Sequence, residues 1–131
     1  MYVDASALLK LYLDEPESDE AMAFVRAARE PATARVARVE VRRRLSLEFD
    51  GSELASVRED FELDWETFRN IEVDEAACER AVLMAEEFGL RTLDALHLGA
   101  ADLLRGQVPL LSYDRRQADA ARKLGWTVHG A

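Results

Sequence analysis

Residues 109–123 read PLLSYDRRQADAARK, and this stretch decides the fold class. Its apolar run at 109–112 predicts a buried strand, and the residues from Asp114 to Lys123 predict a helix. The chain begins in the same way, with a strand at 2–3 and a helix at 6–13 that Ser6 can cap. Asp4 and Asp114 therefore each follow a strand, at the edge where an open parallel sheet binds its ligands.

The rest of the chain alternates between short apolar runs and amphipathic stretches. Strands are predicted at 32–33, 71–73 and 127–128, and helices at 17–29, 36–49, 54–68, 74–88 and 92–105. Strands separated by helices imply βαβ units, so we predict a single α/β domain over residues 1–131 with a short, mainly parallel sheet. One helix repeats large apolar residues at spacings of three and four, which predicts core packing: Leu54, Val57, Phe61, Trp65 and Phe68.

Composition excludes several classes of protein. A chain of 131 residues with 49% hydrophobic and 33% charged residues is not disordered. No apolar run approaches the roughly 20 residues of a membrane-spanning helix, and no basic and apolar leader opens the chain. Cys78 is the only cysteine, which excludes a disulfide framework and a cysteine-built zinc site. We therefore expect a cytoplasmic protein that does not bind membranes.

Asp4 and Asp114 together place two carboxylates at one edge of the predicted sheet. Each of them also suits a helix N-cap, and Asp114 with Gln117 three residues later resembles a capping box. Residue type alone leaves both roles open.

Glu40 lies inside a predicted helix, near the azimuth of Val36 and Leu47, which we interpret as an inward face. A carboxylate there is costly unless it is paired or bound to a metal. The alternative is an ion pair with Arg43 or Arg44, one turn away.

Asp94 lies in the first turn of the helix that begins at Thr92, with Leu98 and Ala101 beside its azimuth. Its alternative role is a favourable interaction with the helix dipole. Two carboxylates about 4 Å apart repel by on the order of 4 kcal/mol at an effective dielectric near 20, and a hard divalent cation removes that repulsion. The four acids therefore predict a Mg²⁺ or Mn²⁺ site.

Four segments of the chain, in this order, resemble the PIN-domain nucleases, and most closely the VapC-type toxins of prokaryotic toxin–antitoxin pairs. They are 2–8 (YVDASAL), 38–42 (RVEVR), 92–97 (TLDALH) and 112–116 (SYDRR). The resemblance covers almost the whole chain except residues 51–70. It implies an α/β/α sandwich, a Mg²⁺-dependent endoribonuclease that cleaves structured RNA, a cognate antitoxin and a homodimer.

The resemblance also implies roles for particular residues. Asp4, Glu40 and Asp94 match the family's catalytic, metal-binding acids, and Asp114 matches a fourth acid whose role varies more. Ser6 and Thr92 match small polar residues that support the site, although both also suit helix caps. His97 matches a family position, but its helix face with Leu93, Ala100 and Leu104 predicts a packed core histidine.

The implied reaction is metal-dependent hydrolysis of an RNA phosphodiester that leaves a 5′ phosphate and a 3′ hydroxyl. No 2′-hydroxyl attack is needed, so selectivity for RNA must come from binding, and single-stranded loops are the expected targets. The net charge of −9, from 17 basic and 26 acidic residues, excludes binding through the overall field. Local phosphate contacts are expected from two clusters, Arg38 with Arg42 and Arg115 with Arg116; ordinary solvated arginines are the alternative.

Other functions remain as alternatives. A haloacid-dehalogenase-like phosphatase needs an acid where Ser6 stands. A receiver domain needs adjacent acids after the first strand and a lysine on a late strand, but Asp4 has no acidic neighbour and neither Lys10 nor Lys123 fits. A PIN nuclease that is not a toxin and a non-catalytic PIN-like interaction module are the two closer alternatives. For the antitoxin, the first two helices offer five apolar contact candidates: Leu8, Leu11, Tyr12, Phe24 and Val25.

Overall fold

A five-stranded parallel sheet forms the centre of the protein, as a computed structural model that describes residues 1–104 and 108–131 shows. The strand order is β3-β2-β1-β4-β5, and each neighbouring pair is parallel. The strands are β1 (Tyr2–Val3), β2 (Ala32–Ala34), β3 (Arg69–Ile71), β4 (Leu110–Ser112) and β5 (Val128–Gly130).

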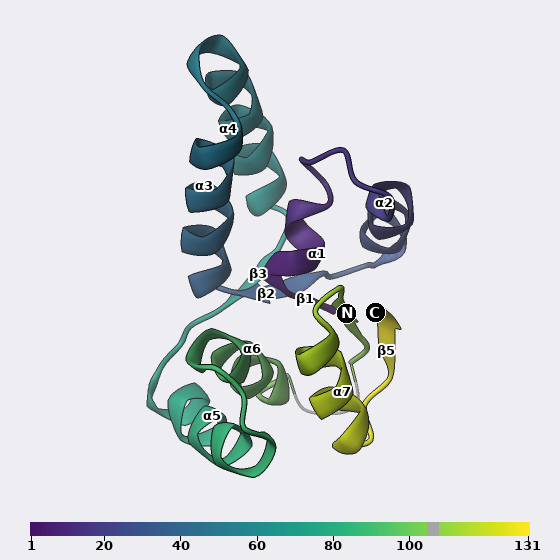
Figure 1. Cartoon of the computed structure of the whole chain (residues 1–131), viewed down its shortest axis with the longest axis vertical. Helices are drawn as coiled ribbons and strands as arrows, with labels where there is room; N and C mark the ends of the chain where they lie inside the picture. The colour runs from purple at the N-terminus through teal and green to yellow at the C-terminus, as the bar shows by residue number, and fades with distance from the viewer. Residues whose placement is uncertain (105–107) are drawn as a thin grey trace.

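Helices cover both faces of this sheet (Figure 1). One face carries α1 (Ala5–Leu9), α2 (Ser18–Ala27), α3 (Val36–Glu48) and α4 (Gly51–Trp65). The other face carries α5 (Glu75–Phe88), α6 (Thr92–Asp102) and α7 (Arg115–Lys123). The predicted α/β/α sandwich is therefore confirmed, and the long α3–α4 hairpin projects beyond the sheet (Figure 1).

The three central strands β1, β2 and β4 are fully buried because helices cover both faces of the sheet. Successive residues of a strand point to opposite faces, so they pack into two separate cores. Val3 of β1 packs on the α1–α3–α4 side, in a cluster with Leu45 and Phe61. Tyr2, one residue earlier, packs on the opposite side with Leu98 and Leu110. This alternation also directs Tyr2 toward α6, where its hydroxyl lies 2.7 Å from Nδ1 of His97.

Local signals place most element ends where the sequence predicts them. The Asp74 carboxylate accepts a hydrogen bond from the Ala77 N–H at the start of α5, and Gly89 ends that helix with φ of 65°. Several boundaries were wrong: α1 ends at Leu9 rather than 13, α4 spans Gly51–Trp65 rather than 54–68, the last strand runs to Gly130, and β3 lies two residues early. β3 is set by its pairing to β2, Ala34 with Ile71, which local sequence does not encode. Helix α6 ends at Asp102, before the predicted end at 105, and residue 105 itself lies outside the described residues.

Strands β1 and β4 are neighbours in the sheet, where Tyr2 pairs with Leu110, although about 108 residues separate them in sequence. The order in which strands are added to the sheet reverses between these two strands. Strands β2 and β3 extend to one side of this pair and β5 extends to the other. A switch point of this kind leaves a crevice beyond the carboxyl ends of the two strands, where α/β proteins bind ligands. Within the described residues, no helix has both the length and the apolar character required to cross a membrane.

Candidate active site

Asp4 is the centre of the site and is almost completely buried, with 1% of its surface exposed. It is also the N-cap of α1, so the two roles left open by the sequence are both filled by one side chain. Its Oδ1 accepts hydrogen bonds from the Ser6 hydroxyl at 2.6 Å and from the Ala7 N–H at 2.9 Å, and its Oδ2 accepts one from the Ser112 hydroxyl. Burial raises the pKa of Asp4, and the nearby His97 and these donors act in the opposite direction.

Two serines fasten Asp4 to the chain that follows β4. The Ser6 hydroxyl accepts the Tyr113 N–H at 2.9 Å, and the Ser112 hydroxyl accepts the Asp114 N–H at 3.1 Å. Because each serine has a single proton and donates it to Asp4, both Asp4 oxygens act as acceptors, as an ionised carboxylate requires. The ends of β1 and β4 are thus joined at the predicted edge.

Asp114 caps α7, because its Oδ1 accepts the Gln117 N–H at 3.1 Å. The reciprocal half of a capping box is missing, since the Asp114 N–H donates to the Ser112 hydroxyl and not to Oε1 of Gln117. The second carboxylate oxygen of Asp114 is therefore not required by the cap.

Glu40 is half-buried on α3 and contacts a histidine rather than an arginine. Its Oε1 lies 2.6 Å from Nε2 of His97, on α6. The predicted alternative, an ion pair with Arg43 or Arg44, is wrong: Arg44 pairs with Glu48. The predicted inward face of this helix was also wrong in part, because its buried face is formed by Ala37, Val41 and Leu45, whereas Leu47 is 65% exposed. Glu40 borders that face and reaches toward α6.

Asp94 lies in the first turn of α6 with its side chain 13% exposed. Its polar contact among the described side chains is a long one, 3.5 Å from Nε of Arg91. Burial raises the pKa of Asp94, the Asp114 carboxylate raises it further, and Arg91 and His97 lower it. The Asp94 carboxylate is thus partly desolvated and repelled by Asp114, and only the long contact with Arg91 offsets these costs through a hydrogen bond.

Three of the predicted acids lie close enough to His97 to change its pKa. Burial alone lowers the pKa of His97, but Glu40, Asp4 and Asp94 outweigh burial and raise the pKa above its ordinary value. Asp94 in turn feels Asp114. Three of the four predicted acids thus act on His97, and the fourth, Asp114, acts on Asp94. Within residues 1–104 and 108–131, no three His, Cys, Asp or Glu side chains form a group that could hold a metal ion as they stand.

Of the remaining predicted residues, Ser6 contacts an acid of the site, whereas Thr92 is exposed. Ser6 supports Asp4, as expected, and does not cap a helix. Thr92 is exposed at the first position of α6, where Arg91 is the N-cap, so its predicted cap role is wrong as well. Ser112 and Tyr2 were not predicted as parts of the site; the only available sign was that Ser112 ends an otherwise apolar strand. His97 is buried, as predicted, and yet it contacts Glu40.

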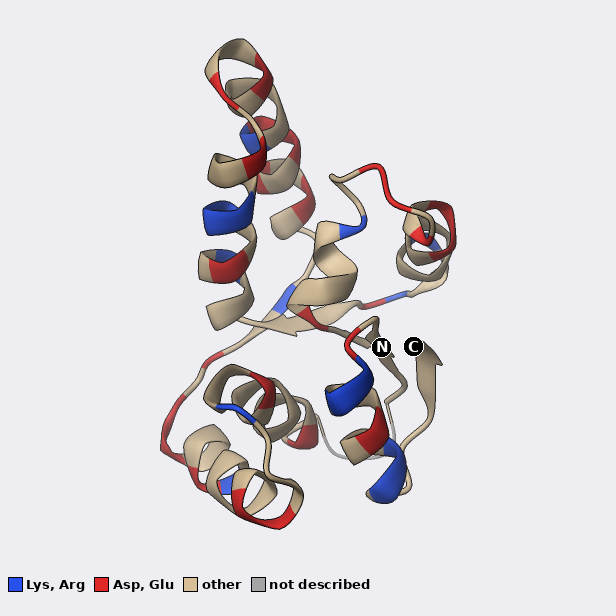
Figure 2. Ribbon diagram, in the orientation of Figure 1, with Lys and Arg blue, Asp and Glu red and all other residues tan. Residues whose placement is uncertain are grey.

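The two arginine clusters differ in their surroundings. Arg38 and Arg42 of α3 both pair with Glu62 of α4, and the Arg38 guanidinium also lies over the Phe61 and Trp65 rings. Arg115 and Arg116 are exposed at the start of α7, with no ion pair among the described residues. Basic residues stand out on α3 and at both ends of α7, and acidic residues occur on every helix except α1 (Figure 2).

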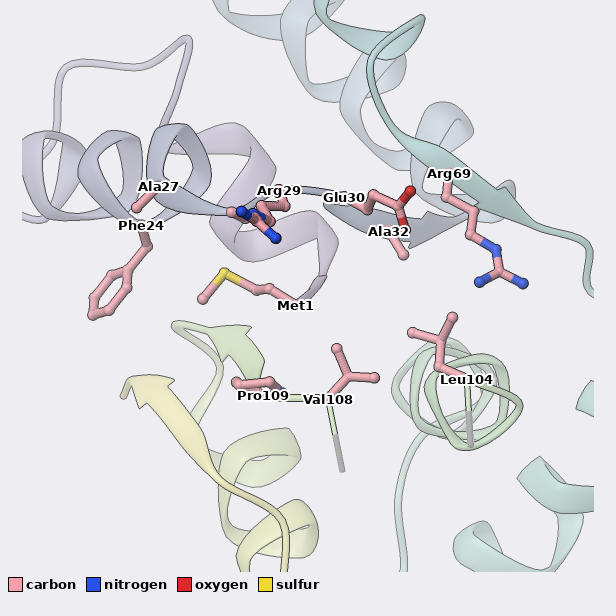
Figure 3. A pocket seen from close by; sticks show the side chains of 11 residues that line it. Met1, Phe24, Ala27, Arg29, Glu30, Ala32, Arg69, Leu104, Val108 and Pro109 are labelled. Carbon is pink, nitrogen blue, oxygen red and sulfur yellow. The ribbon is translucent and has the colours of Figure 1, made fainter. Parts of the chain in front are cut away.

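A cavity of about 740 Å³ lies away from these acids (Figure 3). Met1, Ala32, Arg69 and Pro109 line it, and each stands at or just before the start of a strand. It therefore opens at the amino edge of the sheet, opposite the acids, and its size does not make it the reactive site.

Comparison of the sequence with known proteins shows the family. The family model described as "PIN domain" matches residues 1–123. Ribonuclease VapC46 of Mycobacterium tuberculosis is 36% identical over 129 residues, covering 98% of this chain and 95% of that protein.

Two solved structures share the fold. One is M. tuberculosis VapC20, described as a sarcin-ricin loop cleaving toxin, with a TM-score of 0.71, 15% identity, and coverage of 91% of this chain and 93% of that one. The other is a toxin-antitoxin complex from Klebsiella pneumoniae, with a TM-score of 0.67, 21% identity, and coverage of 86% and 85%. At these identities the structures establish the fold, and the family follows from the sequence matches: the chain belongs to the PIN-domain family, among the ribonucleases of the VapC type.

Proposed function

We propose that this protein is an endoribonuclease that acts as the toxin of a toxin–antitoxin pair and hydrolyses RNA with Mg²⁺ or Mn²⁺. The observation that carries this proposal is the convergence of Asp4, Glu40, Asp94 and Asp114 at the carboxyl edge of β1 and β4. Burial raises the pKa of Asp4 and of Asp94, and Asp114 raises the pKa of Asp94 further, so these charged carboxylates are costly without a cation. Their concentration at this edge is explained by a positive ligand.

The donor set fits a hard divalent cation. Every candidate ligand is a carboxylate oxygen, which Mg²⁺ and Mn²⁺ prefer. Oδ1 of Asp4 already accepts two hydrogen bonds, whereas Oδ2 accepts one and keeps a lone pair for a ligand. Asp94 has only one long contact among the described residues. When bound, the cation would activate water and stabilise charge on the scissile phosphate and its leaving oxygen.

The chain's own residues supply orientation. Ser6 and Ser112 hold the Asp4 carboxylate in place from both sides, so its oxygens are preorganised before any ligand arrives. Asp114 is held by its cap at the start of α7, which fixes its carboxylate relative to the end of β4. We assign catalytic and metal-binding roles to the four acids and a supporting role to Ser6, and keep Thr92 as a supporting residue at the same helix start as Asp94.

For the RNA, we assign phosphate contacts to Arg115 and Arg116 first, because they are exposed beside Asp114 and carry no competing carboxylate among the described residues. Arg38 and Arg42 can contact phosphate only after release from Glu62. The substrate we propose is a single-stranded loop of a structured RNA, in which bases are free to stack.

For protein partners, we propose a cognate antitoxin and a homodimer, in the cytoplasm. The Klebsiella relative in the fold comparison is described as a toxin-antitoxin complex. Of the five apolar contact candidates, Leu8 is wrong because it is fully buried in the core; Leu11, Tyr12, Phe24 and Val25 are partly buried. Large apolar side chains that are exposed on α3 and α4 offer further contact area: Val39, Leu47 and Leu63.

The test of the nuclease proposal is cleavage of total RNA by purified, antitoxin-free protein with Mg²⁺ or Mn²⁺, followed by mapping of the new ends. We expect 5′ phosphates and 3′ hydroxyls that appear with metal and disappear with EDTA. Asp4→Asn and Asp94→Asn should abolish them, while Asp102→Asn, at the far end of α6, should not. Equal cleavage by wild type and Asp94→Asn would refute the proposal.

A further inference from the structure

A chain of hydrogen bonds runs from the backbone of β2 to Glu40 through two buried side chains. The Tyr2 hydroxyl accepts the Ala34 N–H at 3.1 Å and lies 2.7 Å from Nδ1 of His97. The other ring nitrogen of His97, Nε2, lies 2.6 Å from Oε1 of Glu40. Tyr2 and His97 are 1% and 2% exposed, and their rings meet edge to face with centroids 5.9 Å apart.

The proton positions in this chain follow from the donors available. The Tyr2 oxygen already accepts from Ala34, and Glu40 as a carboxylate only accepts, so it needs a donor at Nε2. A neutral His97 therefore carries its proton on Nε2 and accepts from Tyr2 at Nδ1. A charged His97 carries a proton on both nitrogens. In either state Nε2–H donates to Oε1 of Glu40.

The hydrogen bond from His97 holds the Glu40 carboxylate in place, as the hydrogen bonds from Ser6 and Ser112 hold the Asp4 carboxylate. Glu40 projects from α3 on a long side chain, and His97 is its hydrogen-bond partner among the described residues. Because Oε1 is engaged, the unengaged Oε2 is the oxygen available to a ligand. Partners behind a ligating group typically change metal affinity by about 10-fold to 100-fold when removed.

We propose that Tyr2 and His97 are positioning residues that hold the Glu40 carboxylate for the metal, acting through the Nε2–H to Oε1 hydrogen bond. The proposal rests on the proposed function, in which Glu40 is a metal ligand. It explains why a tyrosine and a histidine, each with its polar atoms paired, lie in an otherwise apolar core. A histidine that only fills space would not need the hydroxyl of Tyr2.

The experiment measures the affinity of purified protein for Mn²⁺ alone, from the free-ion signal in electron paramagnetic resonance. Glu40→Gln should weaken binding and thereby establish Glu40 as a ligand. His97→Leu removes the donor and should weaken binding about 10-fold. His97→Gln keeps an N–H donor and should recover most of that decrease, and Tyr2→Phe should weaken binding by a smaller factor.

Matched controls separate this role from packing. His129→Gln removes the only other histidine, which stacks on Phe24, and Tyr12→Phe removes a hydroxyl that donates to Asp64; both should leave Mn²⁺ affinity unchanged. Nitrogen-15 spectra of histidine-labelled protein provide a second readout, in which Tyr2→Phe should change the balance of His97 tautomers.

The outcomes distinguish the two proposals. If Glu40→Gln binds Mn²⁺ as wild type does, Glu40 is not a ligand and both its assigned role and the positioning role fail. If Glu40→Gln weakens binding while folded Tyr2→Phe and His97→Leu bind normally, only the positioning role fails. Because Tyr2→Phe preserves ring and volume, it remains informative even if His97→Leu does not fold.

Discussion

Asp94→Asn should make the metal-free protein more stable while removing its response to metal. The Asp94 carboxylate is 13% exposed, its pKa is raised by burial and by Asp114, and its contact with Arg91 is 3.5 Å long. The amide therefore gives up little hydrogen bonding and removes a repelled charge. Asp4→Asn is a less clean test, because Asp4 accepts three hydrogen bonds.

The expected gain without metal is about 1 kcal/mol, within the usual range for replacing an unfavourable group at a functional site. Wild type should instead gain from metal: a cation at 100 times its dissociation constant stabilises the fold by about 2.7 kcal/mol. With an unfolding entropy of about 2.1 cal/mol/K per residue, a chain of 131 residues converts this into a rise of about 10 °C in Tm. Asp94→Asn should show little or none of that rise.

The pH dependence follows from the same raised pKa. An acid whose pKa is higher in the folded than in the unfolded state binds more protons when folded, so stability falls as pH rises from its unfolded pKa, near 4, through its raised folded value. Metal-free wild type should therefore lose stability over that interval because of Asp4 and Asp94. Asp94→Asn should flatten the slope, and saturating Mg²⁺ should reverse it.

The assay is thermal unfolding of both proteins, with EDTA and with Mg²⁺ or Mn²⁺, at several pH values. Asp102→Asn is the matched control: it lies on the same helix, loses an exposed pair with Arg80, and should change stability by less than about 1 kcal/mol while keeping the full metal response. A metal-induced rise in Tm that is equal in wild type and Asp94→Asn would refute the reasoning.

Three further predictions concern RNA and the antitoxin. Glu62→Gln should free Arg38 and Arg42 and raise RNA affinity by up to about fivefold, because an exposed ion pair contributes about 1 kcal/mol or less; weaker binding in a filter assay would contradict this. Neutralising Arg115 and Arg116 should lower the salt slope of RNA binding by about 0.7 for each phosphate that is no longer neutralised, and an unchanged slope would show that α7 is not in the interface. An antitoxin that places a basic side chain among the acids should compete with metal, so added Mg²⁺ should relieve inhibition at subsaturating antitoxin, and inhibition that does not depend on Mg²⁺ would exclude this mode.

The sequence predicts those site residues whose positions depend on the order of strands and helices. Asp4 and Asp114 follow apolar strands, and parallel strands end at one edge, so their proximity follows once the alternation of strands and helices is recognised. The parallel sheet follows from the same alternation, whereas the α/β/α sandwich was implied by the resemblance to the PIN-domain nucleases. Asp94 and Glu40 could be singled out as acids near apolar helix faces.

The partners of these acids could not be predicted, because they depend on contacts between distant elements. His97 is 57 residues from Glu40 and 95 from Tyr2, so periodicity places it in a core without identifying its hydrogen bonds. The one-turn spacing of Glu40 from Arg43 and Arg44 suggested a partner within its own helix. The observed partner, His97, comes instead from α6 on the other face of the sheet. The position of β3 was wrong for a related reason, since its register depends on pairing with β2.

The central claim is that the four acids bind a divalent cation at the carboxyl edge of β1 and β4. The most direct test is anomalous diffraction from crystals of the protein soaked in Mn²⁺. We predict an anomalous peak within ligand distance, about 2.0–2.3 Å, of carboxylate oxygens of Asp4 and Asp94, and its disappearance in Asp94→Asn. An ordered Mn²⁺ bound elsewhere, with no peak among these acids, would contradict the claim.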